Sequence, residues 1–383
     1  MKHLSKIFYL ALTITSLLFL SCQNEDELTQ QTEQIKLQVD TSKLIDFKGL
    51  PVNHRFRTPV KDLEVVHDYS NLKKMYNEKR KSSFKQKGIA YKSDDELPSA
   101  EIIVEATEKR LDEFPYQENE DSEKDLEMIH KDFPTLTGNE ISENIDIIDE
   151  YYSQNLDYEI LTDIAEDDNM QAKIASSKYQ AKTDWGRFWC ILTKFQSPWH
   201  MIAPIVTGGY IRTGEFSYIR ALISLYYSRR ATGYSENSVF GHLSSTDTQE
   251  DAYRHVVWSS FLAKYYYTVS SKSKRLRFSE AIGNANETCG DNDEDGKYMD
   301  FHNNRVGRKL FNDNCSYRKA PFLWWTINYG LNVPYESTLM NKAETLVKNG
   351  VFIDKQGEGL SEPQTQQRII NVDRNKVVYF ENK

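Results

Sequence analysis

The chain has 383 residues, of which 39% are hydrophobic and 27% charged, and its formal net charge is −9. This composition allows a buried core and more than one structural unit, and it excludes fibrous and wholly disordered classes. The 23 tyrosines and 18 phenylalanines also exceed what a disordered chain usually carries.

The first residues have the pattern of an export signal. Lys2 and Lys6 precede an apolar run over residues 7–20, which is too short to span a bilayer and is typical of a secretory signal. The run ends in Phe-Leu-Ser-Cys at Cys22, which resembles the lipobox of bacterial lipoproteins. The resemblance implies that residues 1–21 are a signal peptide and that a lipid on Cys22 anchors the chain to the outer membrane. Acidic residues 25–27 resemble the acidic tract of some surface-exported lipoproteins, which favours a location on the cell surface for this protein. An ordinary signal peptide that contains a cysteine is the alternative.

Residues 22–93 are predicted to form a weakly ordered tether behind the lipid. The segment is rich in Gln, Glu and Thr up to about residue 40, and it is polar and basic from Lys73 to Lys92. Such a composition favours a flexible connection over a packed unit.

Charge is distributed unevenly along the rest of the chain. Residues 94–168 contain 26 acidic and 4 basic side chains, a net charge of −22, whereas residues 169–383 contain 28 basic and 21 acidic side chains, a net charge of +7. These opposite signs predict contact between the two parts, and a solvated acidic surface is the alternative. The basic residues are spread among aromatic segments, which argues against a nucleic-acid partner.

Apolar residues at helical spacing predict a mainly α fold. In an acidic helical region, residues 94–170, the predicted helices are Ala100–Phe114, Asn139–Tyr152 and Tyr158–Ala165. In a multi-helix globular domain, residues 171–360, they are Tyr179–Phe195, Phe216–Ser228, Asp247–Thr268, Leu276–Thr288, Asp300–Phe311 and Ser337–Lys348. Strand patterns occur only in the tail, residues 361–383, where Ile369–Val372 and Val377–Phe380 predict a small C-terminal β-hairpin.

Three cysteines remain once Cys22 is assigned to the lipid. Cys289 and Cys315 bracket the most unusual loop of the chain and are the expected disulfide pair in an oxidising compartment, with three free thiols as the alternative. Cys190 lies among apolar residues and is expected to be buried as a small apolar side chain. No two cysteines have C-x-x-C spacing, so thiols do not predict a zinc site.

Acidic, amide and imidazole side chains concentrate between residues 251 and 308. Asp251 and His255 are four residues apart on one predicted helix, so the carboxylate and the imidazole share a face. Asn284 and Glu287 share a face of the next predicted helix in the same way. These spacings place polar groups on helix faces that should be buried.

The third predicted helix begins at Asp300, which is expected to be its N-cap. The short loop before Asp300 should return the chain, so that the start of this helix meets the two preceding helices. We therefore expect His255 and His302 to face each other, with Glu287 and Asp300 nearby, in a pocket open to solvent.

Three motifs occur in order across this part of the chain. They are D-A-Y-R-H at residues 251–255, N-E at residues 286–287 and M-D-F-H-N-N-x-x-G at residues 299–307. This series resembles an uncharacterised bacterial domain family with the pattern D-A-aromatic-R-H, H-E and M-D-L-H-N-N-x-x-G. The resemblance implies an α-helical domain of secreted or toxin-like bacterial proteins and brings no activity with it. Asn286 replaces the histidine of the H-E step, which weakens any site that needs three imidazoles.

Two functional hypotheses follow from these residues. In the first, the protein is a hydrolase in which His255, with Asp251 or Glu287, is the general base. The divalent metal of this hypothesis is zinc or calcium, and its ligands are His302 and Asp300, with His255 as a further candidate.

In the second hypothesis, the protein is a non-catalytic interaction or scaffold lipoprotein with a buried structural network. The residues of that network are Arg254, Asn284, Asn303 and Asn304. In both cases the expected partners are the membrane, through Cys22, and an unknown protein or envelope substrate. A toxin-like effector is disfavoured because a lipid anchor prevents diffusion into a target cell.

An acidic segment, residues 291–296, partly resembles an EF-hand calcium loop. Asp291, Asp293 and Asp295 supply oxygens at positions 1, 3 and 5, and Gly296 stands at position 6. Position 12 is His302, where a bidentate glutamate is needed. Calcium binding is one hypothesis, and a solvent-exposed acidic turn is the other.

Overall fold

The computed structural model describes residues 41–62, 69–88, 98–116, 122–177, 217–243, 246–289, 293–322 and 325–380. These residues form twelve α-helices and three two-stranded sheets, so the predicted mainly α fold is confirmed. The lipobox at Cys22, the predicted helix Tyr179–Phe195 and Cys190 lie outside the described residues.

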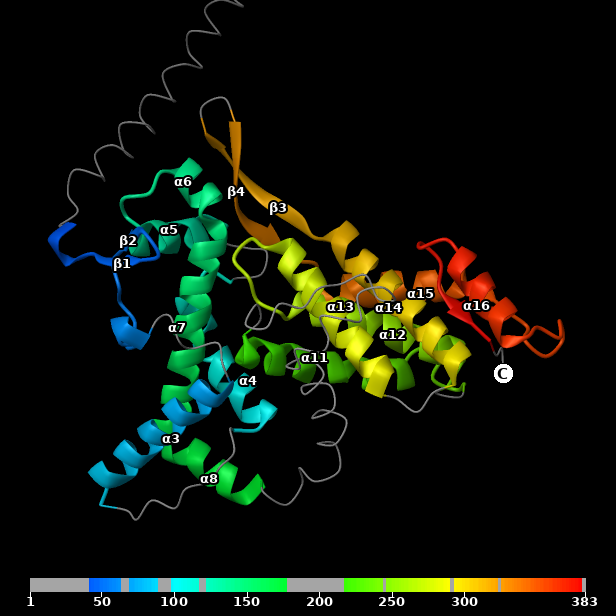
Figure 1. Ribbon diagram of the computed structural model, residues 1–383, viewed down its shortest axis with the longest axis horizontal. Helices are drawn as coiled ribbons and strands as arrows, with labels where there is room; N and C mark the ends of the chain where they lie inside the picture. Colours follow the sequence, from blue (N-terminus) through cyan, green and yellow to red (C-terminus); the bar gives the residue numbers. More distant parts are fainter. Residues whose placement is uncertain are drawn as a thin grey trace, which may run out of the picture.

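The elements fall into two parts along the sequence (Figure 1). The first part contains β1 (Ile45–Phe47), β2 (Leu50–Val52), α3 (Tyr69–Gln86), α4 (Ala100–Glu108), α5 (Ser122–Asp132), α6 (Gly138–Glu143), α7 (Ile145–Glu166) and α8 (Asp168–Ser177). The second contains α11 (Tyr218–Glu236), α12 (Gln249–Lys264), α13 (Lys272–Cys289), α14 (Glu294–Asn314), β3 (Ser316–Phe322), β4 (Trp325–Asn332), α15 (Glu336–Lys348), β5 (Val351–Phe352), α16 (Glu362–Asn371) and β6 (Val378–Tyr379). Short 3-10 turns cover Thr41–Lys43, Val60–Asp62 and Leu111–Glu113.

Part of the predicted tether is folded, which corrects the sequence interpretation. Helix α3 buries Leu72 and Tyr76, which are four residues apart and face α7. The ammonium group of Lys79 lies 3.8 Å from the centroid of the Tyr158 ring on α7. The basic residues between Leu72 and Tyr76 make this segment look too polar for a packed helix. Their long aliphatic stems cover apolar surface while their charged groups stay in water, so they are compatible with packing.

The tail also differs from the prediction. The segment that contains Ile369 is helix α16, which starts at a capping box formed by Ser361 and Gln364. Strand β6 does not pair with the residues around Ile369. It pairs in parallel with β5, so the predicted hairpin is not formed. Adjacent isoleucines are typical of a strand. Here the capping box at Ser361 and Gln364 starts a helix instead, and Ile369 is buried in that helix.

Buried ion pairs join the acidic and basic parts, as their opposite charges predict. Arg318 Nη1 on β3 lies 2.6 Å from Asp125 Oδ2 on α5, and both side chains are at most 4% exposed. Two cations contact the carboxylate of Asp149 on α7. Nη1 of the fully buried Arg220 on α11 lies 3.6 Å from one oxygen, and Nζ of Lys274 on α13 lies 3.3 Å from the other. These contacts fix α7 against α11 and against α13, which carries the second of the three motifs.

One buried acid at this interface gives a prediction about pH. Asp157 of α7 is fully buried, its carboxyl oxygens lie 2.9 and 2.7 Å from Ser217 Oγ, and burial raises its pKa to about 7. Because the pKa is higher in the folded state, the folded chain binds this proton more tightly and loses stability as the pH rises from about 4 to 7. Asp157→Asn should therefore stabilise the protein more at pH 8 than at pH 4.5, by roughly 1–3 kcal/mol. Urea unfolding at both pH values measures this difference, and an equal effect at both would contradict it.

Candidate metal site

Helices α12, α13 and α14 pack against one another and bring the three motifs together (Figure 1). The backbones approach closely at Gly307 of α14, where a Cβ atom would lie only 2.3 Å from the carbonyl oxygen of Val256 on α12. Only glycine permits this approach. From α13, Ser279 Oγ donates a hydrogen bond to the carbonyl of Ser259 on α12 at 2.7 Å. Small residues thus set the spacing of the three helices.

The start of α12 holds Asp251 in place. Thr248 is the N-cap, and the carboxylate of Asp251 accepts a hydrogen bond from the backbone amide of Asp247 at 2.8 Å. Asp247 has a φ of 62°, a left-handed conformation that aspartate tolerates, and its carbonyl accepts a hydrogen bond from the amide of Phe380 at 2.8 Å. Arg254 donates to the other oxygen of Asp251. Both oxygens of this carboxylate are therefore oriented.

His255 lies at the centre of three carboxylates. Its Nε2 is 3.1 Å from Asp300 Oδ1 and 3.4 Å from Asp251 Oδ1. Its Nδ1 is 3.6 Å from Glu287 Oε1 and donates a hydrogen bond to Asn304 Oδ1 at 3.2 Å. Ligand atoms of Asp251, His255 and Asp300 all lie within 4.8 Å of one another, so this buried group could hold a metal ion.

Amide and hydroxyl groups orient the central residues. Asn304 Nδ2 and Asn286 Nδ2 both donate to Glu287 Oε1, at 2.9 and 3.1 Å, and Ser259 Oγ donates to Asn304 Oδ1 at 2.9 Å. Glu287 Oε2 is buried, and the carboxyl groups of Glu287 and Asp300 are hydrogen-bonded to each other. Sequence reasoning missed Ser259, although it follows His255 by four residues on the same face, and it treated Asn286 only as a lost histidine.

The buried charges shift the pKa values of the site. Burial lowers the pKa of His255, but the carboxylates of Asp300, Glu287 and Asp251 outweigh burial and raise it to about 9. Burial raises the pKa of Asp251, but His255 and Arg254 bring it down to about 2. Burial holds the pKa of Asp300 well above its usual range, and the charges of Glu287 and Asp251 add to this effect against the attraction of His255. The site therefore crowds negative charge around one imidazole.

His302 lies outside this group, so the predicted pairing of the two histidines is wrong. Its Nε2 donates to the carbonyl of Lys376 at 2.8 Å. Its neighbour Asn303 exchanges two hydrogen bonds of 2.9 Å with the backbone of Val378 in β6. Two positions along a helix correspond to a rotation of about 200°, so His302 points away when Asp300 points toward His255. His302 and Asn303 instead attach residues 376–378 to α14.

The described part of the acidic segment, residues 293–296, forms the start of α14 and not a loop. Asp293 is the N-cap and accepts a hydrogen bond from a first-turn amide at 2.6 Å, so Asp300 is a mid-helix residue and not the predicted N-cap. Asp295 is buried and lies 2.9 Å from Lys355 Nζ. A helical backbone cannot wrap these oxygens around an ion as an EF-hand loop does. Asp291 lies outside the described residues.

The predicted disulfide between Cys289 and Cys315 is also wrong. Cys315 is a free, buried thiol, whereas Cys289 is disulfide-bonded. Lys272, the first residue of α13, donates to the carbonyl of Cys315 at 2.7 Å, so Cys315 lies beside the opposite end of α13 from Cys289. An 18-residue helix is about 27 Å long, far beyond the roughly 7 Å between Cα atoms that a disulfide allows.

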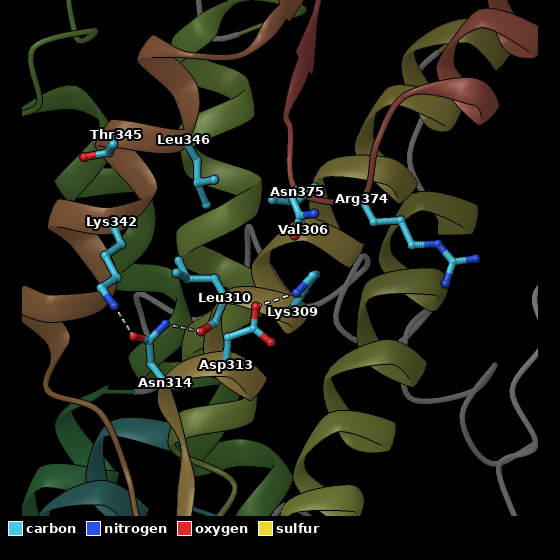
Figure 2. A pocket seen from close by; sticks show the side chains of 10 residues that line it. All are labelled: Val306, Lys309, Leu310, Asp313, Asn314, Lys342, Thr345, Leu346, Arg374 and Asn375. Carbon is cyan, nitrogen blue, oxygen red and sulfur yellow. Dashed lines mark hydrogen bonds and ion pairs between the residues drawn. The ribbon is translucent and has the colours of Figure 1, made fainter.

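The site is buried and not the solvent-open pocket that the sequence suggested. Asp251, His255 and Asp300 are 3%, 5% and 0% exposed. A groove of about 250 Å³ lies elsewhere on α14, facing α15, and Figure 2 shows its lining, which includes Leu310 and Lys342. None of the residues around His255 lines this groove.

The predicted structural network is partly present. Arg254, Asn303 and Asn304 make the buried contacts described above. Asn284 is half-buried on α13, and its backbone carbonyl accepts a hydrogen bond from Thr288 Oγ1 at 2.7 Å. The third motif therefore serves two purposes, since Asp300 and Asn304 face His255 while His302 and Asn303 face the tail.

Residues 215–328 match a family model described as a domain of unknown function, DUF6973. The matched range contains all three motifs, so the similarity to an uncharacterised domain family is confirmed. No curated protein and no solved structure matches the chain. Geometry and chemistry at His255 therefore carry the functional argument.

Proposed function

We propose that the domain is a metal-dependent hydrolase in which Asp251, His255 and Asp300 bind one divalent cation. The observation that carries this proposal is the convergence of buried carboxylates on a single imidazole. The two carboxylate oxygens lie 3.1 and 3.4 Å from His255 Nε2. Ligand atoms about 2.1 Å from a tetrahedral ion are about 3.4 Å apart, so the observed spacing fits such an ion.

The charges of the site can accommodate a cation. Without an ion, the raised pKa of Asp300 keeps that carboxyl group protonated, so the carboxylates of Asp251 and Glu287 balance the imidazolium of His255 and the guanidinium of Arg254. With a divalent ion, Asp300 and His255 would each release a proton, and the ion and Arg254 together would balance three carboxylates. Binding should therefore release protons and weaken as the pH falls.

The ligand set favours zinc or a related transition ion over calcium. One imidazole nitrogen and two carboxylate oxygens are ligands that zinc accepts, whereas calcium prefers six to eight oxygens. His255 also has the partner expected of a metal-bound imidazole, because its Nδ1 donates to Asn304. We therefore propose zinc or a similar ion.

Glu287 is the proposed general base. Two amides hold its Oε1, its Oε2 is buried, and its carboxylate is hydrogen-bonded to the carboxyl group of Asp300. The ion, held by Asp251, His255 and Asp300, would supply Lewis-acid chemistry, while Glu287 Oε2 would take the proton of the attacking water and return it to the leaving group.

The near-complete burial of the group favours a second function, in which the ion only joins three helices of a scaffold. Asp300 and Glu287 are 0% and 1% exposed. Both functions require the bound ion, but only the hydrolase converts a substrate. Glu287→Gln should keep the ion in both cases, and it should remove a hydrolytic activity only if the site is catalytic.

Elemental analysis of the purified chain tests the proposal. About one zinc or related ion per chain is expected at neutral pH, and EDTA should lower the melting temperature. A chain that purifies without any bound ion and does not take one up from solution would contradict the proposal.

We also propose that the chain is a bacterial outer-membrane lipoprotein, anchored at Cys22, whose substrate or protein partner lies in the envelope. The apolar run that ends at Cys22 supports this proposal. None of the helices in the described ranges has the length and hydrophobicity of a membrane span. Cys22→Ala should abolish incorporation of labelled palmitate and move the protein to the soluble fraction. A variant that stays with the membrane would argue against the anchor.

A further inference from the structure

Helix α3 carries a row of lysines on the face that points away from the rest of the protein. The helix contains six basic side chains and one acidic side chain, which gives it a net charge of +5. Its inner face, with Leu72 and Tyr76, packs against α7. Because each residue of a helix turns by about 100°, Lys74, Lys81 and Lys85 fall within an arc of about 40° on the opposite face. All three residues are exposed, and we call them the outer row.

The charges of the outer row are not neutralised by acids in the described part of the chain. None of its three lysines forms an ion pair there. Lys87, just beyond the helix, does form one, since its Nζ lies 2.5 Å from Asp168 Oδ1. Glu78 borders the row and offsets one of its charges. The outer row therefore has two excess positive charges, and it extends over about 17 Å of helix.

The outer row lies close in sequence to the proposed lipid anchor. Cys22 and the first described residue, Thr41, are 19 positions apart, and a chain of this length spans at most about 65 Å. An acyl group on Cys22 would therefore keep the folded part within that distance of a bilayer. Figure 1 shows α3 at one end of the molecule, beside α7 and α8, so the outer row can meet a flat surface.

An anionic membrane surface fits a straight row of ammonium groups. Its head groups present negative charges throughout a plane, and each lysine at such a surface strengthens binding about fivefold. The net charge of the whole chain, −9, does not prevent this contact, because charges more than about 10 Å away are largely screened. The two excess charges of the outer row give weak, salt-sensitive binding. They can orient a chain that is already anchored, but they do not hold an unanchored chain on the membrane through a wash at physiological salt.

We propose that the outer row binds the anionic head groups of the membrane to which Cys22 is attached, and that this contact sets the orientation of the folded part. The inference rests on the proposed anchor and is independent of the proposed metal site. Helix α3 packs against α7, and buried ion pairs join α7 to α11 and α13. Contact at α3 therefore orients the helices around His255 relative to the membrane as well.

Sedimentation with lipid vesicles at low salt tests the proposal. The protein is the chain that remains after residues 1–21 are removed, with Cys22→Ala, so that neither the signal peptide nor an acyl chain contributes. It should bind vesicles of phosphatidylcholine that contain one third phosphatidylglycerol, should not bind pure phosphatidylcholine, and should be released by added salt. The combination of Lys74→Gln, Lys81→Gln and Lys85→Gln should weaken binding at least about twentyfold. Because all three lysines are exposed, the melting temperature should be unchanged.

The matched control combines Lys297→Gln, Lys309→Gln and Lys348→Gln, which lower the net charge by the same amount on α14 and α15. These lysines form surface ion pairs whose loss costs little stability. Because their charges are screened from the membrane, vesicle binding should change less than about twofold. A second test works in the opposite direction: Glu78→Gln removes the acid beside the outer row and should strengthen binding about fivefold.

Equal binding to pure phosphatidylcholine, or an equal loss of affinity in the control variant, would overturn the proposal. Duplex DNA that displaces the chain from the vesicles at an equal concentration of phosphate would also overturn it, because the outer row would then prefer a different polyanion. Labelling with palmitate separates this inference from the anchor. A chain that is labelled at Cys22 but does not bind the anionic vesicles rejects the outer row alone, whereas vesicle binding by a chain that is never labelled rejects the anchor alone.

Discussion

Asp300→Asn is expected to abolish tight binding of a divalent ion without unfolding the protein. The amide has the shape of the carboxyl group but gives up its negative charge, and Asp300 Oδ1 is the carboxylate oxygen nearest to His255 Nε2, at 3.1 Å. Removing one of three ligands from a small ion should lower its affinity at least 100-fold, about 3 kcal/mol. The measurement is metal content by elemental analysis, together with competition against a chromogenic chelator.

The melting temperature of this variant separates a ligand from a structural hydrogen-bonding residue. In EDTA, the variant should be about as stable as the wild type, because a neutral amide replaces a carboxyl group whose raised pKa keeps it protonated. With added zinc, only the wild type should gain stability, since a bound ligand stabilises the state that binds it. A variant that melts far below the wild type in EDTA, with neither protein responding to zinc, would instead support a purely structural network.

Gly307→Ala is expected to have the largest effect on stability. The added Cβ would lie 2.3 Å from the carbonyl oxygen of Val256 and 2.9 Å from Ser259 Cβ, and neither α12 nor α14 can yield without separating from the other. We expect a loss of at least about 3 kcal/mol in the free energy of unfolding. Asp300 lies two turns before Gly307 on the same face of α14, so the shift should also weaken metal binding.

The control for this substitution is Gly233→Ala on α11, where a Cβ atom would meet nothing within 4 Å. Alanine should stabilise that exposed helical position by up to about 1 kcal/mol. Chemical denaturation of both variants distinguishes a steric effect at Gly307 from a general effect of glycine replacement. Similar stabilities for the two variants would show that α12 and α14 can move apart at little cost.

The sequence could predict much of the site because helix geometry fixes it locally. Asp251 and His255 share a face through their spacing of four, and the density of polar residues on three successive helices predicted that Glu287 and Asp300 would join them. His302 was misplaced because the direction in which it points depends on where α14 begins. That start is set by Asp293, seven residues before Asp300.

Other errors came from interactions between distant parts of the chain. Consecutive helices with a short connection run antiparallel, so Cys289 and Cys315 belong to opposite ends of α13, and attention to helix direction would have shown this. The tail could not be predicted in this way. Strand β6 is placed by hydrogen bonds to Asn303, 75 residues earlier, and no local pattern contains that information.

The attachment of the tail has a consequence for the order in which the site can form during synthesis. Asp247 orients Asp251 through its amide and is itself held by the amide of Phe380. All three candidate ligands leave the ribosome before residue 380 is translated, so a nascent chain already carries the ligands but lacks the contact that fixes one of them. Under the proposed function, tight capture of an ion is therefore a late event, and the metals present where the chain completes its folding decide which ion it keeps.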